Sequence, residues 1–185
     1  MSLSPEKAQR ALDTAERLCS AAEVTQAVTR MAGEITAALG RSFPLVLCVM
    51  RGSVIFAGQL LPRLEFPLEF DYLDVTRYRE ETRGGEIAWK VTPGTAVAGR
   101  VVLVLDDILD EGQTLAAVKG KLLAAGASRV SCAVFAEKDI GRAKPVTADF
   151  VGVHLPNRYV FGFGMDIGGA WRNLPEIYAV KEGNE

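Results

Sequence analysis

The stretch Val101–Leu115, VVLVLDDILDEGQTL, decides the fold, because it reads as a strand, a loop and the start of a helix. Its first five residues are all apolar, which is typical of a strand covered on both faces of a parallel sheet. The N–H groups at a helix N-terminus form an anion site. The loop nevertheless contains no Lys or Arg, and it holds four carboxylates, those of Asp106, Asp107, Asp110 and Glu111.

The loop offers two kinds of group, and each suits a different part of a sugar phosphate. Backbone N–H groups of residues 110–114, with the Thr114 hydroxyl, suit a terminal phosphate, and Gly112 would let the backbone approach it closely. The Asp106 and Asp107 carboxylates suit a pair of adjacent hydroxyls or a hydrated cation. The lysine of the GxxxxGK[ST] pattern is missing, which argues against a kinase or ATPase of that class. The predicted ligand is a ribose 5-phosphate.

Strand and helix patterns alternate on both sides of this stretch. Continuous or alternating apolar runs predict strands, and 3.6-residue spacing predicts helices. One helix is expected from Ser4 to about Cys19, and the polar segment 79–98, with a short strand-like run at 86–91, is expected to lie outside the main sheet. The alternation predicts an α/β protein with a mainly parallel sheet flanked by helices. Candidate site loops then follow three strands, at 51–53, 106–114 and 137–139.

Composition narrows the class of protein. A chain of 185 residues with 49% apolar and 24% charged residues is expected to form one domain. A formal net charge of -2 gives no support to a nucleic-acid partner. No apolar run is long enough for a membrane span, and no signal core is seen at the N-terminus. Three cysteines, an odd count, are expected to be buried free thiols of a cytoplasmic protein.

The sequence resembles the type I phosphoribosyltransferases in several segments. VLVLDDILDEGQTL is similar to their phosphoribosyl-diphosphate (PRPP) loop, LCVMRGSVIFAGQLL to their pyrophosphate loop, and YLDVTRYRE to the segment that enters their flexible catalytic loop. The segment 148–180 is similar to the purine-recognition part of the hypoxanthine-guanine subgroup, particularly its short bacterial forms. The resemblance runs in order from about 44 to 180.

The resemblance implies a fold, a reaction and a cofactor. The fold would be one domain, 1–185, with a helical N-terminal part (about 4–40), a core (about 44–137) and a small C-terminal hood that recognises the base (about 148–180). The reaction would join a 6-oxopurine to PRPP, giving IMP or GMP and pyrophosphate in purine salvage. Mg²⁺ would be the cofactor, and the chain would form a homodimer or homotetramer.

The resemblance also implies a role for individual residues. Asp110 would be the catalytic base near the purine N7. PRPP would be bound by Asp106, Asp107, Asp110, Gly112, Gln113 and Thr114; pyrophosphate by Arg51, Gly52 and Arg172; and the purine by Lys138, Tyr159 and Val160. Metal would be held by Asp106, Asp107 and Asp166, and Tyr78 would belong to the flexible lid loop. A non-proline cis peptide is expected at Met50–Arg51.

The chain departs from the family pattern at a few positions. Glu111 stands where Thr or Ser is usual in the PRPP loop, and it is expected to point away from the phosphate. Two other functions stay open at this stage. One is a phosphoribosyltransferase that prefers xanthine, because base choice depends on few contacts. The other is a regulatory RNA-binding protein with the same fold, for which the net charge gives little support.

Overall fold

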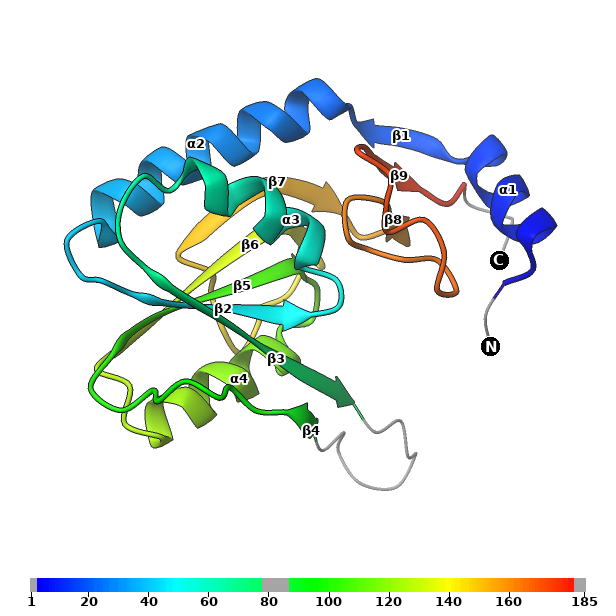
Figure 1. Cartoon of the computed structure of the whole chain (residues 1–185). Helices are drawn as coiled ribbons and strands as arrows, with labels where there is room; N and C mark the ends of the chain where they lie inside the picture. Colours follow the sequence, from blue (N-terminus) through cyan, green and yellow to red (C-terminus); the bar gives the residue numbers. More distant parts are fainter. Residues whose placement is uncertain (1–2, 78–86, 182–185) are drawn as a thin grey trace.

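A computed structural model describes residues 3–77 and 87–181 of the chain. Its centre is a six-stranded sheet in the order β4-β3-β2-β5-β6-β7 (Figure 1). The strands are β2 (Leu45–Met50), β3 (Glu69–Arg77), β4 (Ile87–Val91), β5 (Val101–Leu109), β6 (Arg129–Asp139) and β7 (Phe150–Pro156). All neighbouring pairs are parallel except β3 and β4. The predicted α/β class with a mainly parallel sheet is confirmed.

Helices cover both faces of this sheet, as Figure 1 shows. α2 (Ala21–Leu39) and α3 (Val54–Leu60), which runs into the short 3-10 helix η1 (Leu61–Arg63), lie on one face, and α4 (Gln113–Ala124) lies on the other. Strand β5 serves both cores by alternation: Leu103 and Leu105 pack with the α2–α3 side, whereas Val102 and Val104 pack with the α4 side. This double burial explains why the strand is apolar throughout.

A second, three-stranded sheet joins the two ends of the chain. It has the order β1-β9-β8 and consists of β1 (Glu16–Cys19), β9 (Ile177–Ala179) and β8 (Val160–Phe161). The helix α1 (Pro5–Thr14) precedes it and is held to the C-terminal part by the Trp171 Nε1–H, which donates to the Ala8 carbonyl at 2.6 Å. We call this small sheet, together with Tyr159 and the loop 162–176, the hood.

Two expectations about secondary structure were wrong. The helix expected up to Cys19 ends at Thr14, because Glu16–Cys19 pairs antiparallel with β9. The strand-like run near Trp89 is the edge strand β4 of the main sheet, paired with β3, rather than a segment outside it. For Glu16–Cys19 the pairing strand is far along the chain. For the run near Trp89, nothing in the local sequence shows that β3 has a free edge with which it can pair. Residues 78–86, including the expected lid residue Tyr78, lie outside the described residues.

The topology places one crevice where the strand order changes direction. From β2 the chain goes to β3 on one side and later to β5 on the other, so β2 and β5 are neighbours at a switch point. Ligands of open α/β sheets bind outside the carboxyl ends of strands at such a point. The loops after β2 and β5, at 51–53 and 110–112, lie there. Within the described residues, no helix is both long enough and apolar enough for a bilayer span.

Candidate active site

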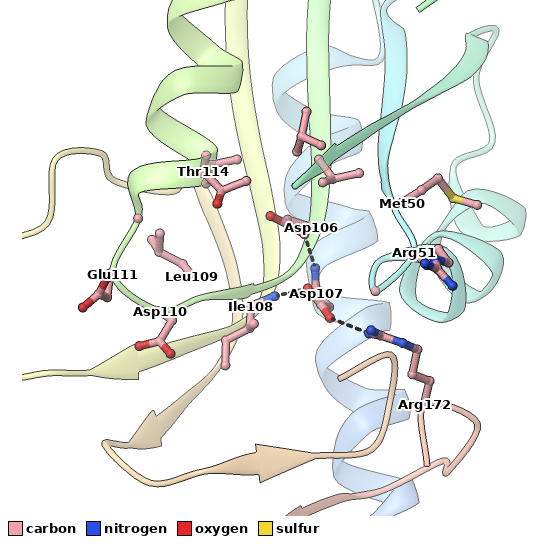
Figure 2. A pocket seen from close by; sticks show the side chains of 15 residues that line it. Met50, Arg51, Asp106, Asp107, Ile108, Leu109, Asp110, Glu111, Thr114 and Arg172 are labelled. Carbon is pink, nitrogen blue, oxygen red and sulfur yellow. Dashed lines mark hydrogen bonds and ion pairs between the residues drawn. The ribbon is translucent and has the colours of Figure 1, made fainter. Parts of the chain in front are cut away.

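The loop after β5 lines a cavity of about 500 Å³ at this switch point (Figure 2). Gly112 is the N-cap of α4 and has a φ of 82°, which an L side chain rarely adopts. The first turn of α4 offers N–H groups that have no partner within the helix. Thr114 lines the cavity, whereas Gln113 is exposed and does not. The loop thus ends in a helix start with free N–H groups, as the sequence predicted, and the Gln113 side chain lies outside the cavity.

The loop after β2 forms the opposite wall of this cavity. Arg51 and Gly52 line it, and the Met50–Arg51 peptide bond is cis, as the sequence analysis predicted. A Cβ added to Gly52 would lie only 2.0 Å from Asp107 Oδ2, so the lack of a side chain lets the two loops meet. Glycine is thus required here for close approach.

Asp106 and Asp107 form a buried acidic pair at the end of β5. Asp106 is 9% exposed and the Asp107 side chain 13%. The Asp107 N–H donates to Asp106 Oδ1 at 3.0 Å, and the Ile108 N–H donates to Asp107 Oδ1 at 3.0 Å. Burial raises the pKa of Asp106 well above its ordinary value, and the charge of Asp107 raises it further. Burial also raises the pKa of Asp107, against the opposing effects of Asp106 and Arg172.

Arg172 brings the hood to this acidic pair. Its Nη1 lies 4.0 Å from Asp107 Oδ2 and donates to the Gly164 carbonyl at 2.6 Å, and its Nη2 is ion-paired with Asp166. Figure 2 shows the guanidinium pointing at Asp107. The second oxygen of Asp166 accepts from the Gly169 N–H at 2.6 Å. Arg172, one of the expected pyrophosphate ligands, is therefore a neighbour of Asp107 and Asp166, two of the three expected metal ligands.

A second cavity of about 230 Å³ adjoins the first, and the two share Asp107, Ile108, Asp110 and Arg172. Lys138, at the end of β6, lines the second cavity and not the first, and its ammonium donates to Asp110 Oδ2 at 2.7 Å. Tyr159 and Val160 come from the hood and line the same space. The residues expected to bind the purine therefore lie together, beside the phosphate cradle.

The side chain of Tyr159 stands at the rim of this second cavity. The residue is 51% exposed, and its hydroxyl donates to the Asp166 carbonyl at 3.2 Å. The hydroxyl is thus held by a residue of the hood, and the ring is accessible to solvent. An exposed ring beside a cavity of this size can stack on a flat ligand.

Glu111 lines the first cavity, but its carboxylate is turned away from the acidic pair (Figure 2), in line with the expectation that it points away. Its carboxylate pairs with Arg142 at 3.0 Å, and Figure 2 shows the side chain directed away from the acidic pair. Two residues that line the second cavity, Ile108 and Met165, were not among the site residues expected from the sequence. Each is an apolar residue in a stretch already marked for another reason, so nothing in the sequence distinguished it from a core residue.

The acidic pair is suited to a cation, which a buried and poorly solvated carboxylate pair needs for charge balance. Among the described residues, no group of three or more His, Cys, Asp or Glu side chains could by itself enclose a metal ion. A pair of carboxylates fits Mg²⁺, which is commonly bound through one or two carboxylates together with substrate phosphates and water. A metal that binds without substrate would have few protein ligands here.

We predict that Asp106→Asn stabilises the metal-free protein at high pH. A carboxyl with a raised pKa in the folded state lowers the free energy of unfolding as the pH rises. The loss begins above the unfolded pKa, about 3.9, and is complete above the folded pKa. The variant should therefore exceed the wild type in free energy of unfolding at pH 8 by about 1 kcal/mol or more, with a smaller gain at pH 5. Urea unfolding with a chelator present measures both values.

The matched control is Asp139→Asn, which removes an exposed carboxylate at the end of β6. It should change the free energy of unfolding by less than about 0.5 kcal/mol at either pH. If Asp106→Asn is no more stable than the wild type at pH 8, the buried charge of Asp106 does not lower the free energy of unfolding.

Comparisons with known proteins agree with this geometry. A family model described as "Phosphoribosyl transferase domain" matches residues 15–167. The chain is 32% identical over 170 residues to the hypoxanthine-guanine phosphoribosyltransferase of Bacillus subtilis strain 168, covering 91% of this chain and 94% of the relative. It is also 32% identical over 173 residues to the hypoxanthine-guanine-xanthine phosphoribosyltransferase of Tritrichomonas foetus, covering 92% and 94%.

Solved structures show the same architecture. One described as a hypoxanthine-guanine-xanthine phosphoribosyltransferase has a TM-score of 0.84 and 30% identity, covering 92% of this chain and 99% of its own. A hypoxanthine phosphoribosyltransferase from Staphylococcus aureus has a TM-score of 0.86 and covers 92% of this chain and 94% of its own. At 24% identity the latter comparison supports the fold alone.

Proposed function

Because this chain belongs to the phosphoribosyl transferase family, we propose that it transfers the phosphoribosyl group of PRPP to hypoxanthine or guanine, giving IMP or GMP and pyrophosphate. One observation carries the proposal: the Asp110–Lys138 pair lies in a small cavity next to a phosphate cradle. The relatives named for hypoxanthine and guanine support the base class. The T. foetus relative is also named for xanthine, so xanthine is the base to test as an alternative.

We propose that the large cavity holds PRPP. The 5-phosphate would accept hydrogen bonds from the main-chain N–H groups of 110–114 and the Thr114 hydroxyl at the start of α4. The ribose hydroxyls would donate to Asp106 and Asp107. The pyrophosphate would face Arg51, Gly52 and Arg172 across the switch point. Arginine suits this position because its planar guanidinium can make two parallel bonds to phosphate oxygens.

Mg²⁺ is the proposed cofactor, held by Asp106 and Asp107, with Asp166 near a second ion. The cation would supply positive charge that offsets the charge of the pyrophosphate. The raised pKa of Asp106 supports this assignment, because a group that resists ionisation gains most from a nearby cation. Asp166 is ion-paired with Arg172 in the free protein, so it would exchange that partner when a ligand binds.

The second cavity would take the purine, with Tyr159 stacked on the ring and the Val160 main chain beside it. The O6 and N7 atoms of a 6-oxopurine lie on one edge of the ring, and Lys138 and Asp110 are a matching donor and acceptor pair. Lys138 would donate to O6, and Asp110 would take the proton from N7 as N9 attacks C1' of the ribose. Asp110 is then the general base of the reaction.

Four further expectations remain proposals. The chain is proposed to act as one phosphoribosyltransferase domain and to assemble as a homodimer or homotetramer. Exposed aromatic side chains of β3, Phe70 and Tyr72, support self-association, because contiguous exposed apolar groups mark interaction surfaces. The three cysteines are all buried and free, which favours a cytosolic location. Tyr78 is proposed to belong to a lid that covers the reacting atoms.

The first experiment follows nucleotide formation from PRPP with hypoxanthine, guanine, xanthine and adenine. We expect transfer to hypoxanthine or guanine and only trace transfer to adenine, because a lysine donor matches a 6-oxo group and not a 6-amino group. A chelator should abolish transfer and added Mg²⁺ should restore it. Folded protein that transfers to none of the four bases would overturn the proposed function.

We expect Lys138→Met to weaken base selection. The variant keeps most of the length of the side chain but loses the donor, so kcat/KM for hypoxanthine should fall by about 10- to 100-fold while the trace activity with adenine changes little. Lys119→Met, on the second turn of α4 and outside both cavities, is the control. An unchanged ratio of hypoxanthine to adenine use would remove Lys138 from base recognition.

We expect Asp110→Asn to lower kcat by about 10²- to 10⁴-fold, the range for loss of a positioned general base. The amide keeps the shape of the side chain but cannot take the N7 proton. The KM for PRPP should change by less than about threefold, because the interaction acts in the transition state. Asp139→Asn again serves as the control, and a wild-type kcat for Asp110→Asn would exclude Asp110 as the base.

A further inference from the structure

A buried lysine behind the purine cavity has no role in the proposed reaction. Lys144 lies in the connection between β6 and β7, and only 9% of its side chain is exposed. Its ammonium donates to the Lys138 carbonyl at 2.6 Å, to the Leu109 carbonyl at 3.0 Å and to Glu137 Oε1 at 3.1 Å. An ammonium has three N–H donors, and these three acceptors match them.

The three acceptors lie where the strand ladder between β5 and β6 ends. The last pair in register is Leu109 with Glu137, and the chain after Leu109 turns into the phosphate cradle. The ammonium of Lys144 donates to one carbonyl of each strand, that of Leu109 on β5 and that of Lys138 on β6. It therefore links the two strands at the end of their ladder.

The bonded carbonyls belong directly to the proposed base-reading residues. One is the carbonyl of Lys138 itself, and the other belongs to the peptide that links Leu109 to Asp110. The side chains of Lys138 and Asp110 meet at 2.7 Å on the cavity side of the same main-chain segments. Lys144 thus fixes the backbone of both partners from behind.

We propose that Lys144 is a positioning residue that sets the distance between Asp110 and Lys138, and through it the fit of the purine edge. The proposal rests on the proposed function, because it assigns the two partners to N7 and O6 of the base. Lys144 does not line the purine cavity; it lines a neighbouring one with Glu137, Thr147 and His154. It therefore acts through Lys138 and Asp110 and does not contact substrate.

A charged residue at this place has a physical reason. Burying an ammonium is costly unless it is paired and hydrogen-bonded, and Glu137 supplies the pairing. An apolar side chain of the same length would leave two carbonyls and a carboxylate without this donor. The Leu109 and Lys138 segments would then be free to shift relative to each other, and displacements on the order of 1 Å at a reacting centre lower rates strongly.

The test compares steady-state parameters of the wild type, Lys144→Met and Arg142→Met, with PRPP and hypoxanthine varied separately. Arg142 is the matched control because it lies in the same connection and pairs with a glutamate, but its side chain is 68% exposed. We expect Lys144→Met to raise the KM for hypoxanthine and lower kcat/KM for it by about tenfold or more. The KM for PRPP should change by less than about threefold, because the N–H groups in the first turn of α4 are not bonded to Lys144. Arg142→Met should match the wild type.

The outcomes separate positioning from stability. KM values do not depend on the folded fraction, so they remain readable if Lys144→Met is partly unfolded. Lys144→Gln, whose amide keeps two N–H donors, supplies a second variant and should show the same change in hypoxanthine KM to a smaller extent. A lower kcat with both KM values unchanged, or wild-type parameters, would overturn the proposal. Failure of the wild type itself to use any purine would instead overturn the proposed function.

Discussion

The site depends on one unfavourable arrangement, the burial of two adjacent carboxylates at the end of a parallel strand. Asp106 and Asp107 follow five apolar residues of β5; the ladder to β2 ends at Leu105, whereas the ladder to β6 continues past the pair to Leu109. Each carboxylate accepts one main-chain N–H from the next residue, which is little compensation for lost water. The raised pKa of Asp106 expresses this deficit. A cation or a set of donating hydroxyls would remove it, so the free protein is prepared for such a ligand.

The other site residues reach this pair through contacts that are distant in the chain. Gly52 comes from the loop after β2 and approaches Asp107 closely because it has no Cβ. Arg172 and Tyr159 come from the hood, whose sheet combines β1 with the C-terminal strands. The hood is also packed against the main core, because the Phe163 ring lies 4.3 Å from that of Phe135 on β6. The cavity for the base therefore exists only when both ends of the chain are in place.

This assembly explains which features could be predicted from the sequence. The central strands and the PRPP loop have local signatures: apolar runs of strand length and an Asp-x-Gly-x-Thr turn at a helix start. The cis peptide at Met50–Arg51 was also anticipated, and it followed from the resemblance alone. By contrast, β1 was assigned to a helix, because its pairing with β9 joins residues about 160 positions apart. Lys144 carried no signal either, since a lysine in a polar connection is ordinarily a surface residue.

The free protein satisfies the charges of its site with pairs that a substrate would have to replace. Asp110 is paired with Lys138 and Asp166 with Arg172, so each group expected to contact substrate already has a partner. The Lys138 donor and the Asp110 acceptor match O6 and N7 of a 6-oxopurine. A bound base could therefore replace the Lys138–Asp110 ion pair with one contact to each residue, so that neither charge would lack a partner. A base with a 6-amino group would leave the ammonium facing another donor, and lost pairing of this kind is costly. Selectivity for the oxo group then follows from the existing pair as much as from any new contact. Under the proposed function, base choice would depend on the distance across that pair, which we propose the main chain behind it controls.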